Sequence, residues 1–298
     1  MLTFSYLRSR NDEHSEDKYH FGAGQCGVSR IVCAEHHGEI DTMNRQRLII
    51  RISRDSIALS TSDNGQVRYE RYPMNSGISL AANMREALRT QLILQDDYEH
   101  VLVLVDSPVL TIPVAMFREE ERDQLYHYTF TRHDQFMVMH AVLPDLNAVA
   151  VFAVQKDLRQ VLADRFGHVS YQPLMSAVWR HMYQKSFTGQ HAKLYCYYHD
   201  RKLEVFAFGP NRFKFQNTYA VTTPDDALYY LLSVWKQLGM DPQSDELHLA
   251  GTMPELKDRA LTFVKRVFAS NPSGEFNRAP VTQIDGMPYD VMLVYLRS

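Results

Sequence analysis

The sequence predicts a mixed α/β protein made of two similar halves, each with a mixed sheet and helices. Runs rich in β-branched and aromatic residues alternate with amphipathic helical patterns, which is typical of α/β architecture. A strand–strand–strand–helix–strand order also occurs twice. Its landmarks are the turns at Asn64 and Pro210, the helix starts at Ser79 and Pro224, and the strands beginning at Val101 and Glu246. Their offsets of 146, 145 and 145 residues predict an internal duplication.

The first copy of this unit begins with three runs that favour strands. They span Leu48–Arg54, Ile57–Thr61 and Val67–Tyr72. Asp63–Gly65 is expected to be a turn, because Asn and Gly tolerate positive φ. Ser79 caps an expected helix that runs to about Leu94. The apolar run Val101–Val105 then predicts a buried central strand.

The second copy repeats this order. Its expected strands are Lys193–Tyr198, Leu203–Phe208 and Phe213–Ala220. Thr223 is expected to cap a helix with Pro224 in its first turn and acidic residues near its positive end. The helix is expected to end at Leu238, before Gly239. Glu246–Ala250 predicts the strand that follows.

The remaining elements are fitted around the two copies. Between them we expect helices near Arg118–His127, Lys156–Phe166 and Pro173–Tyr183, and strands near Gln135–Val142, Asn147–Ala153 and His168–Tyr171. After the second copy we expect a helix over Glu255–Phe268 and a final strand over Asp290–Leu296.

The predicted domain organisation has three parts. Residues 1–43 are polar and have no sustained period, so we expect a disordered extension, and Met43 is an alternative start of translation. The first half is expected to span 44–188, with an insertion at about 109–154. The second half is expected to span 189–298.

The composition excludes several classes of protein. Across 298 residues, 32 Lys and Arg face 35 Asp and Glu, so the net charge of -3 argues against a dedicated nucleic-acid or membrane-surface binder. The three cysteines are too few for a disulfide framework. The N-terminus lacks the apolar core of a secretory signal, and the longest apolar run, Ala148–Val154, is too short to span a bilayer. We therefore expect a cytoplasmic protein.

The sequence also resembles a known family. It is similar, over roughly Arg47–Arg297, to an uncharacterised domain-of-unknown-function family of Bacteroidales and their relatives. The distinctive segments are Val103–Pro108, Ala227–Gly239 and Glu246–Gly251. The resemblance implies an actin-like ATPase (ribonuclease-H-like) fold in two halves, each with a five-stranded mixed sheet. It also implies relatives among the cytoplasmic platform proteins of type IV pilus and type II secretion assembly, but no established activity.

An ATPase of that fold needs an Asp-x-Gly phosphate loop in the first hairpin of each half. The glycine lets backbone N–H groups approach phosphate, and the acid organises metal and water. The first hairpin reads Arg51 to Ser56 and the second reads Tyr197 to Lys202, and neither contains glycine. We therefore expect no catalytic residues and no cofactor. Asp55 and Asp200 are the acids in these loops whose replacement would abolish hydrolysis if hydrolysis occurred.

Four residues are weak candidates for a cleft between the halves. Asp106 ends a buried strand, where ligands bind in such sheets, although an Asp before Ser107 and Pro108 also suits a turn. Asp200 lies in the second hairpin, and Gly251 and Thr252 follow a late strand. Thr252 with Glu255 also makes an ordinary capping box.

Two further patterns concern metal and nucleic acid. Cys26, Cys33, His36 and His37 have spacing that fits zinc poorly, so no metal is expected. Aromatic residues interleaved with basic ones in the second-half hairpins suit single-stranded nucleic acid, a protein-binding face or ordinary sheet packing. These residues are Tyr195, Tyr197, Tyr198, Arg201, Lys202, Phe206, Phe208, Arg212, Phe213, Lys214, Phe215 and Tyr219.

The functional hypothesis is a non-catalytic module that binds another protein, as an assembly or scaffold component. It follows from the repeated architecture and the altered phosphate loops. One alternative is a nucleotide-binding regulator without efficient hydrolysis, and a further alternative is an RNA-associated protein. Without an apolar span in the sequence, a membrane role would require a partner.

Overall fold

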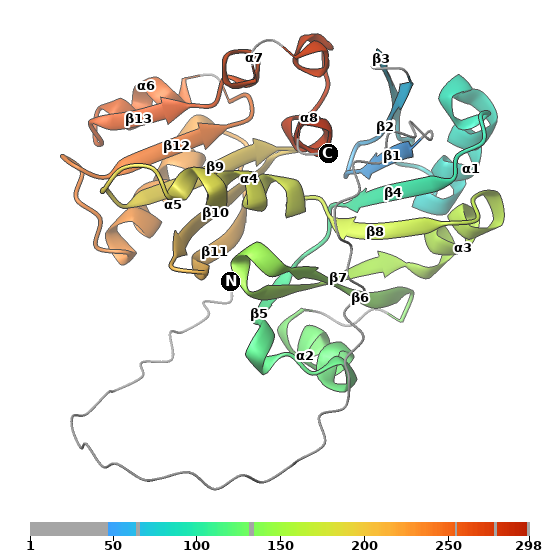
Figure 1. The fold of residues 1–298 in the computed structure, drawn as a ribbon, viewed down its shortest axis with the longest axis horizontal. Helices are drawn as coiled ribbons and strands as arrows, with labels where there is room; N and C mark the ends of the chain where they lie inside the picture. Colours follow the sequence, from blue (N-terminus) through green and yellow to red (C-terminus); the bar gives the residue numbers. More distant parts are fainter. Residues whose placement is uncertain (1–46, 64–65, 131–133, 254, 277–278, 297–298) are drawn as a thin grey trace, which may run out of the picture. The chain divides into compact units, whose positions relative to one another are not determined.

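The computed structural model describes residues 47–63, 66–130, 134–253, 255–276 and 279–296 (Figure 1). All of them belong to one compact unit, Met43–Ser298. The expected extension at 1–43, the cysteines and histidines at 26–37 and the turn residues Asn64 and Gly65 lie outside the described residues.

The first sheet has five strands in the order β3-β2-β1-β4-β8. These are β1 (Arg47–Ile52), β2 (Ser56–Asp63), β3 (Gln66–Pro73), β4 (His100–Val105) and β8 (Val169–Pro173). The first three are antiparallel, whereas β4 is parallel to both β1 and β8. All five strands were expected from the sequence. The buried apolar residues of β4 place it in the middle of the parallel part.

The second sheet repeats that arrangement in the order β11-β10-β9-β12-β13. Its strands are β9 (Lys193–His199), β10 (Lys202–Gly209), β11 (Arg212–Ala220), β12 (Glu246–Ala250) and β13 (Arg266–Ala269). Again the first three are antiparallel and the last two extend the sheet in parallel. The two sheets therefore share strand order and strand direction.

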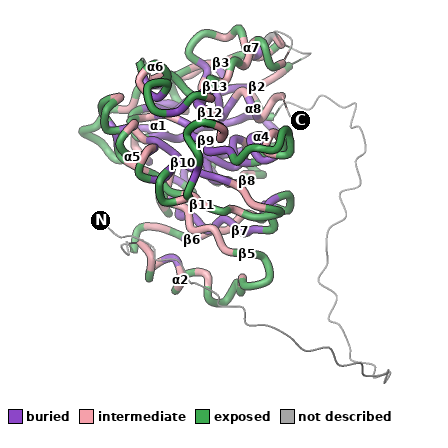
Figure 2. Tube along the Cα trace, turned by 90° about the vertical axis from the view of Figure 1, so that its left-hand side faces the viewer, coloured by how far each residue is buried: buried purple, intermediate pink, exposed green. Residues whose placement is uncertain are grey.

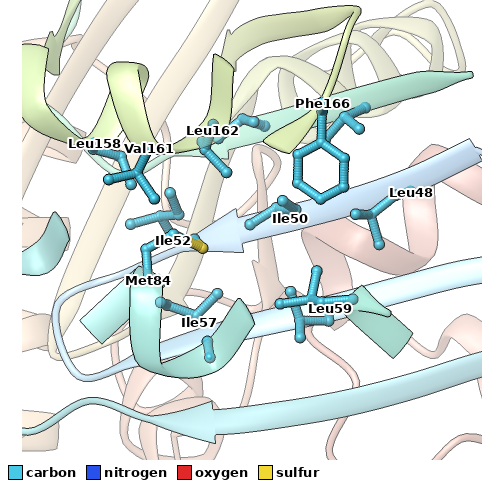
Figure 3. Close-up of a cluster of buried hydrophobic side chains, with 14 of the residues drawn as sticks. Leu48, Ile50, Ile52, Ile57, Leu59, Met84, Leu158, Val161, Leu162 and Phe166 are labelled. Carbon is cyan, nitrogen blue, oxygen red and sulfur yellow. The ribbon is translucent and has the colours of Figure 1, made fainter. Parts of the chain in front are cut away.

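Helices cover each sheet and form a core with it. In the first core, apolar residues of β1 and β2 meet Met84 of α1 (Leu80–Thr90) and Leu158 of α3 (Lys156–Arg165), as Figure 3 shows. The hydroxyl of Ser79 accepts a bond from the Ala82 N–H and caps α1 as expected, and a short 3-10 turn, η1 (Leu92–Leu94), follows. Figure 2 shows that burial is concentrated along the strands.

The second core is covered by α5 (Pro224–Gln237). This helix starts with a complete capping box, in which Thr223 and Asp226 each bond the other's backbone N–H. The structure therefore confirms both the expected start of this helix and the capping role of Thr223.

A third, three-stranded sheet has the order β5-β7-β6 and lies within the expected insertion. Its strands are β5 (Leu110–Pro113), β6 (Phe136–Leu143) and β7 (Ala148–Gln155). One face packs against α2 (Arg122–Thr129) through Tyr126 and Val138. Short 3-10 turns connect these elements: η2 (Val114–Met116), η3 (Glu119–Glu121) and η4 (Pro144–Leu146). The sequence predicted α2, β6 and β7 but missed β5.

Two helices each pack on a five-stranded sheet other than the one whose strand precedes them in the chain. The helix α4 (Ser176–Ser186) precedes the second sheet in the chain, yet its Trp179 shares a core with Phe206 of β10. The helix α8 (Tyr289–Tyr295) follows the second sheet, yet its Val291 packs with Ile49 and Leu102 of the first. Figure 1 shows α4 and α8 between the two five-stranded sheets.

The helix expected over Glu255–Phe268 is wrong in its second part. The helix α6 covers only Leu256–Leu261, and the chain then enters β13, where Val267 pairs beside Leu247 of β12. A run of apolar residues this short fits the period of a helix and that of a strand, so pairing with β12 decides which of the two forms.

The final strand expected over Asp290–Leu296 is also wrong, because this segment is the helix α8. Its apolar residues pack on β1 and β4. The sequence of the segment alone does not reveal this packing surface. The short elements α7 (Pro272–Glu275) and η5 (Pro280–Gln283) before it were not predicted.

Candidate functional site

The first hairpin turns of the two five-stranded sheets, β1–β2 and β9–β10, meet and are joined by two ion pairs. Arg51, near the end of β1, donates from Nη2 to Asp200 Oδ2 at 2.6 Å. Arg201 donates from Nη2 to Asp55 Oδ2 at 2.8 Å. The first pair is largely buried, whereas both members of the second are about half exposed. The two hairpins, at which an ATPase of this fold would carry its phosphate loops, are thus linked to each other by these side chains.

Arg51 also connects the hairpins to α8. Its Nε lies 2.9 and 3.0 Å from the two carboxylate oxygens of Asp290, a residue with no exposed surface. Burial by itself lowers the pKa of Arg51, but the carboxylates of Asp290 and Asp200 outweigh it and raise that pKa well above its usual value. The guanidinium is therefore a permanent cation held by two acids.

The hydroxyl of Tyr197 completes the environment of Asp290. It donates to Asp290 Oδ2 at 3.0 Å. Burial, followed by the negative charge of Asp290, holds the pKa of Tyr197 far above its usual value, so the hydroxyl stays protonated and can donate.

His199 lies between two acids on the other side of the turn. Its Nδ1 is 3.0 Å from Asp200 Oδ2, and its Nε2 is 3.6 Å from Glu204 Oε1, an ion-pair distance slightly too long for a hydrogen bond. Burial lowers the pKa of His199, but its interactions with Asp200 and Glu204 prevail and raise the pKa to about 9. The ring is therefore an imidazolium at neutral pH.

The charge on Asp200 is stabilised from two directions. Burial raises the pKa of Asp200, but the hydrogen bond from His199 and the positive charge of Arg51 outweigh it and hold that pKa well below its usual value. Asp200 therefore stays a carboxylate that bridges the first hairpin, through Arg51, to its own strand.

Asp106 lies beside this group, as its place at the end of β4 predicts. Its backbone N–H donates to Ile52 O at 3.0 Å, and its carboxylate accepts from Lys202 Nζ at 2.7 Å. Ligand atoms of Asp106, His199 and Asp200 lie within 4.8 Å of one another, a spacing and donor set that suit a divalent cation. In this structure the two carboxylates are bound to Lys202 and Arg51.

We call this group the central network; its members are Arg51, Asp106, Tyr197, His199, Asp200, Lys202, Glu204 and Asp290. A cavity of about 10 Å³ adjoins it, lined in part by Asp106, Glu204 and Thr218. That space fits about one water molecule, whereas cavities that hold drug-sized ligands measure hundreds of cubic ångströms.

The backbone of the second turn is unusual for its residue types. Asp200 and Arg201 have φ of 43° and 61°, which is the left-handed region that Gly and Asn usually occupy in two-residue hairpins. Arg51 and Asp55 bind the side chains of these two residues and hold them in this position.

Packing requires a glycine at position 251. Its φ is 81°, and a Cβ at this position would lie 2.0 Å from the carbonyl oxygen of Tyr198. The junction after β12 therefore needs glycine to approach β9. The ring of Tyr197, a member of the central network, also adjoins this position, because its Cδ2 would lie 3.2 Å from that Cβ. Thr252, the next residue, is exposed.

The capping box expected from Thr252 and Glu255 is wrong. Glu255 itself is the residue before α6, with φ of 66°, and it makes no side-chain cap. Its carboxylate instead accepts from Arg259 at 2.8 Å. The left-handed backbone at Glu255 turns the chain before the helix and leaves the N-cap role unfilled.

Several aromatic residues of the second half lie in the core. Tyr195, Tyr197 and Phe206 are almost fully buried, and the rings of Tyr195 and Phe206 stack at 5.8 Å between centroids. The basic Arg212 and Lys214 of β11 are exposed. For the buried aromatic residues, sheet packing is therefore the explanation.

Of the eight network members, the sequence selected only Asp106 and Asp200 as site candidates. Arg51, Tyr197 and Lys202 entered other patterns, whereas Asp290, Glu204 and His199 were not singled out. Asp290 was expected within a strand, and nothing local marks its distant partner Arg51. A signal existed for the other two, because β10 carries a lone acid between apolar residues and β9 ends in a histidine.

Comparison with solved structures identifies the class of fold. A Bacteroides thetaiotaomicron protein with an actin-like ATPase fold and unknown function matches with a TM-score of 0.70 at 23% identity, covering 83% of this chain and 100% of that one. A PilM–PilN type IV pilus biogenesis complex matches with a TM-score of 0.55 at 11% identity, covering 85% and 98%. The chain has an actin-like fold.

The family follows from the sequence profile that matches residues 35–268. The chain belongs to DUF3822, a family of proteins of unknown function. No curated protein matches it. Within the described residues, no helix is long and apolar enough to cross a membrane.

Proposed function

We propose that this chain is a non-catalytic, cytoplasmic actin-like protein, formed by internal duplication, that acts by binding another protein in an assembly. The observation that carries the proposal is the Arg51–Asp200 ion pair. It closes the gap between the two hairpins at the positions where an ATPase of this fold presents its phosphate loops.

The charges of the central network support this reading. Polyphosphate binding needs free N–H donors and net positive charge. Here Arg51, Lys202 and His199 are already bound to carboxylates. The network holds four acids, Asp106, Asp200, Glu204 and Asp290, against these three cations, so a polyanion would meet uncompensated negative charge.

The proposed kind of partner rests on a structural neighbour. The pilus biogenesis neighbour was solved as a PilM–PilN complex, which is a property of that assembly. We extend protein binding to this chain as part of the proposal. Any membrane association of this chain would then come through its partner. The division into halves at 44–188 and 189–298 stays a prediction.

The test uses the purified full chain. Calorimetry with ATP, ADP and GTP in the presence of magnesium is expected to show no binding heat, and phosphate release is expected to stay at background. Hydrolysis that disappears on Asp55→Asn or Asp200→Asn would contradict the proposal. Affinity purification from the native cell is expected to recover a stoichiometric protein partner.

One observation favours a second function, a nucleotide-binding regulator. Asp106, His199 and Asp200 form a group that suits a divalent cation, and nucleotides bind with such ions. If this reading holds, calorimetry shows magnesium-dependent nucleotide binding without turnover. The RNA alternative keeps only the exposed basic residues of β11, and crosslinking of RNA to the native protein tests it.

A further inference from the structure

The indole of Trp179 carries a buried hydrogen-bond donor that needs a partner. This side chain of α4 is fully buried, and among the described residues its Nε1 has no hydrogen-bond partner. Buried polar groups in folded proteins are almost always paired, either with another protein group or with ordered water, because an unpaired one is costly. The donor of Trp179 therefore calls for an acceptor from outside the described chain.

The small cavity beside the central network adjoins this tryptophan. Its volume is about 10 Å³, and its lining includes Trp179, Asp106 at the end of β4 and Glu204 of β10. A buried water molecule needs about this much space and two to four polar partners. The cavity thus brings a donor from α4 together with one carboxylate from each five-stranded sheet.

Both carboxylates can accept a further hydrogen bond. Asp106 accepts from Lys202 Nζ through Oδ1, and Glu204 accepts from Thr218 Oγ1 through Oε2 at 2.7 Å. The other oxygen of Glu204, Oε1, lies 3.6 Å from His199 Nε2, which is too long for a hydrogen bond. A carboxylate offers about four acceptor positions, so each of these two side chains has positions left.

We propose that one water molecule is bound in this cavity as a structural ligand. It accepts from the indole N–H of Trp179 and donates to the carboxylates of Asp106 and Glu204. Water accepts and donates at the same time, so it matches an unpaired donor that shares a cavity with two acceptors. The bound water joins α4 to β10 and to the end of β4, three elements that meet at the central network.

The lining disfavours an ion in the same place. An anion would meet the two buried carboxylates, and a cation would meet the indole N–H, which can only donate. Asp106 is already paired with Lys202, and Glu204 lies beside the protonated ring of His199. The cavity therefore suits a neutral molecule, and its volume limits that molecule to water.

A second tryptophan provides an internal comparison. Trp235 of α5 is also buried, and its Nε1 likewise has no hydrogen-bond partner among the described residues. It belongs to the second core and is not among the residues that line the cavity. The chain contains only these two tryptophans, so their indole N–H groups can be observed separately in the intact protein.

The experiment is nuclear magnetic resonance of the isotopically labelled full chain. The variants Trp179→Phe and Trp235→Phe assign the two indole signals, because each removes one of them. In rotating-frame spectra, whose sign separates proximity from proton exchange, the Trp179 signal is expected to show a cross-peak to a long-lived water. The Trp235 signal is expected to show none.

A cavity-filling variant tests the location of the water. Val109 lines the cavity, and Val109→Ile adds a methyl group that is expected to displace the water. The Trp179 cross-peak should then disappear, and relaxation dispersion of the water oxygen nuclei should count one long-lived water fewer than in wild type. The matched control is Val114→Ile, which enlarges an exposed valine of η2 and should change neither readout.

Three results would overturn the proposal. One is a Trp179 signal without a water cross-peak, and another is a cross-peak of equal strength at Trp235. The third is a Trp179 signal that shifts when sodium replaces potassium at constant ionic strength, because this result assigns the cavity to a metal cation. The wild-type spectra decide all three outcomes even if Val109→Ile folds poorly.

These outcomes are separate from the proposed function, because binding of this water requires neither nucleotide nor a partner protein. Nucleotide binding to the full chain would contradict the proposed function whether or not the cross-peak is seen. A missing cross-peak would remove the water and leave the proposed function unchanged.

Discussion

Arg51 and Asp200 are separated by 149 residues in the sequence, yet their side chains meet at 2.6 Å in a largely buried ion pair. Each lies at the hairpin of a different sheet. This contact joins the two sheets through their first hairpin turns. Four predictions follow from the network around it and from the glycine beside it.

Replacing Arg51 with Met is expected to destabilise the fold strongly. The substitution keeps an apolar stem but leaves Asp290 and Asp200 as buried carboxylates without their main cation. Loss of one partner from a buried ion pair costs about 3 to 5 kcal/mol. Urea unfolding followed by circular dichroism measures this change in the free energy of unfolding.

The matched control for this prediction is Arg54→Met. Arg54 is exposed in the same hairpin, so its loss is expected to change stability by less than about 0.5 kcal/mol. Equal effects of the two variants would show that the buried pair contributes little.

Stability is expected to fall as the solution becomes alkaline. The folded protein raises the pKa of His199 to about 9, above the ordinary value of 6.5. A raised pKa contributes stability that is fully present below pH 6.5 and is lost as pH rises towards 9. Urea midpoints measured across this window should decline in wild type.

His199→Gln provides the comparison for the pH series. Glutamine occupies a similar volume and can hydrogen-bond, but it does not titrate. Its unfolding midpoint should be lower than that of wild type at pH 6.5 and should change less between there and pH 9. A variant that retains the full wild-type slope would assign the pH dependence to another group.

Gly251→Ala is expected to be severely destabilising. The added Cβ meets the Tyr198 carbonyl oxygen at 2.0 Å, and φ is 81°. We expect the free energy of unfolding to fall by more than about 3 kcal/mol. The Tyr198 backbone must move to make room for the methyl group, and alanine is also strained at this φ. Gly239 has a similar φ of 65° but no atom within 4 Å of its Cβ position. Gly239→Ala should therefore lower the free energy of unfolding by only about 1 kcal/mol. Thermal melts of the two variants then distinguish the cost of the steric clash from the cost of backbone strain.

Lys202→Ala is expected to create a metal site. Removing the ammonium frees Asp106 next to His199 and Asp200, whose ligand atoms lie within 4.8 Å of it. Calorimetry should detect Zn²⁺ binding by the variant that is stronger than that by wild type, with release of the proton that His199 holds at neutral pH, because a ligating imidazole must be neutral. The control is Lys214→Ala, which removes an exposed lysine from β11. Equal affinity in all three proteins would show that Lys202 does not compete for this position.

Much of the fold could be predicted from local pattern. The strand β4 contains a continuous apolar run, β1 is apolar apart from Arg47 and Arg51, and α5 carries its start signal in Thr223 and Asp226. The exceptions are short segments: β5 in the three-stranded sheet, and several elements near the C-terminus. The helix α8 and the strand β13 are apolar segments of seven and four residues, and their state depends on the sheet each one joins.

The site could be predicted less well, for a related reason. Asp106 and Asp200 were found because strand ends and hairpin turns are visible in sequence. Their neighbour Asp290 comes from a helix 239 residues after Arg51, and no local signal links the two. The sequence shows that the two hairpins lack glycine, whereas the ion pairs between them are seen only in the structure.

The positions of α4 and α8 affect the order in which the chain can fold during synthesis. The face of the first sheet formed by Ile49 and Leu102 is covered by α8, which the ribosome makes last among the described helices. Domains made first usually fold first. Here the N-terminal sheet keeps an uncovered apolar face until residues 289–295 have emerged, so we expect a nascent chain arrested before that point to engage chaperones.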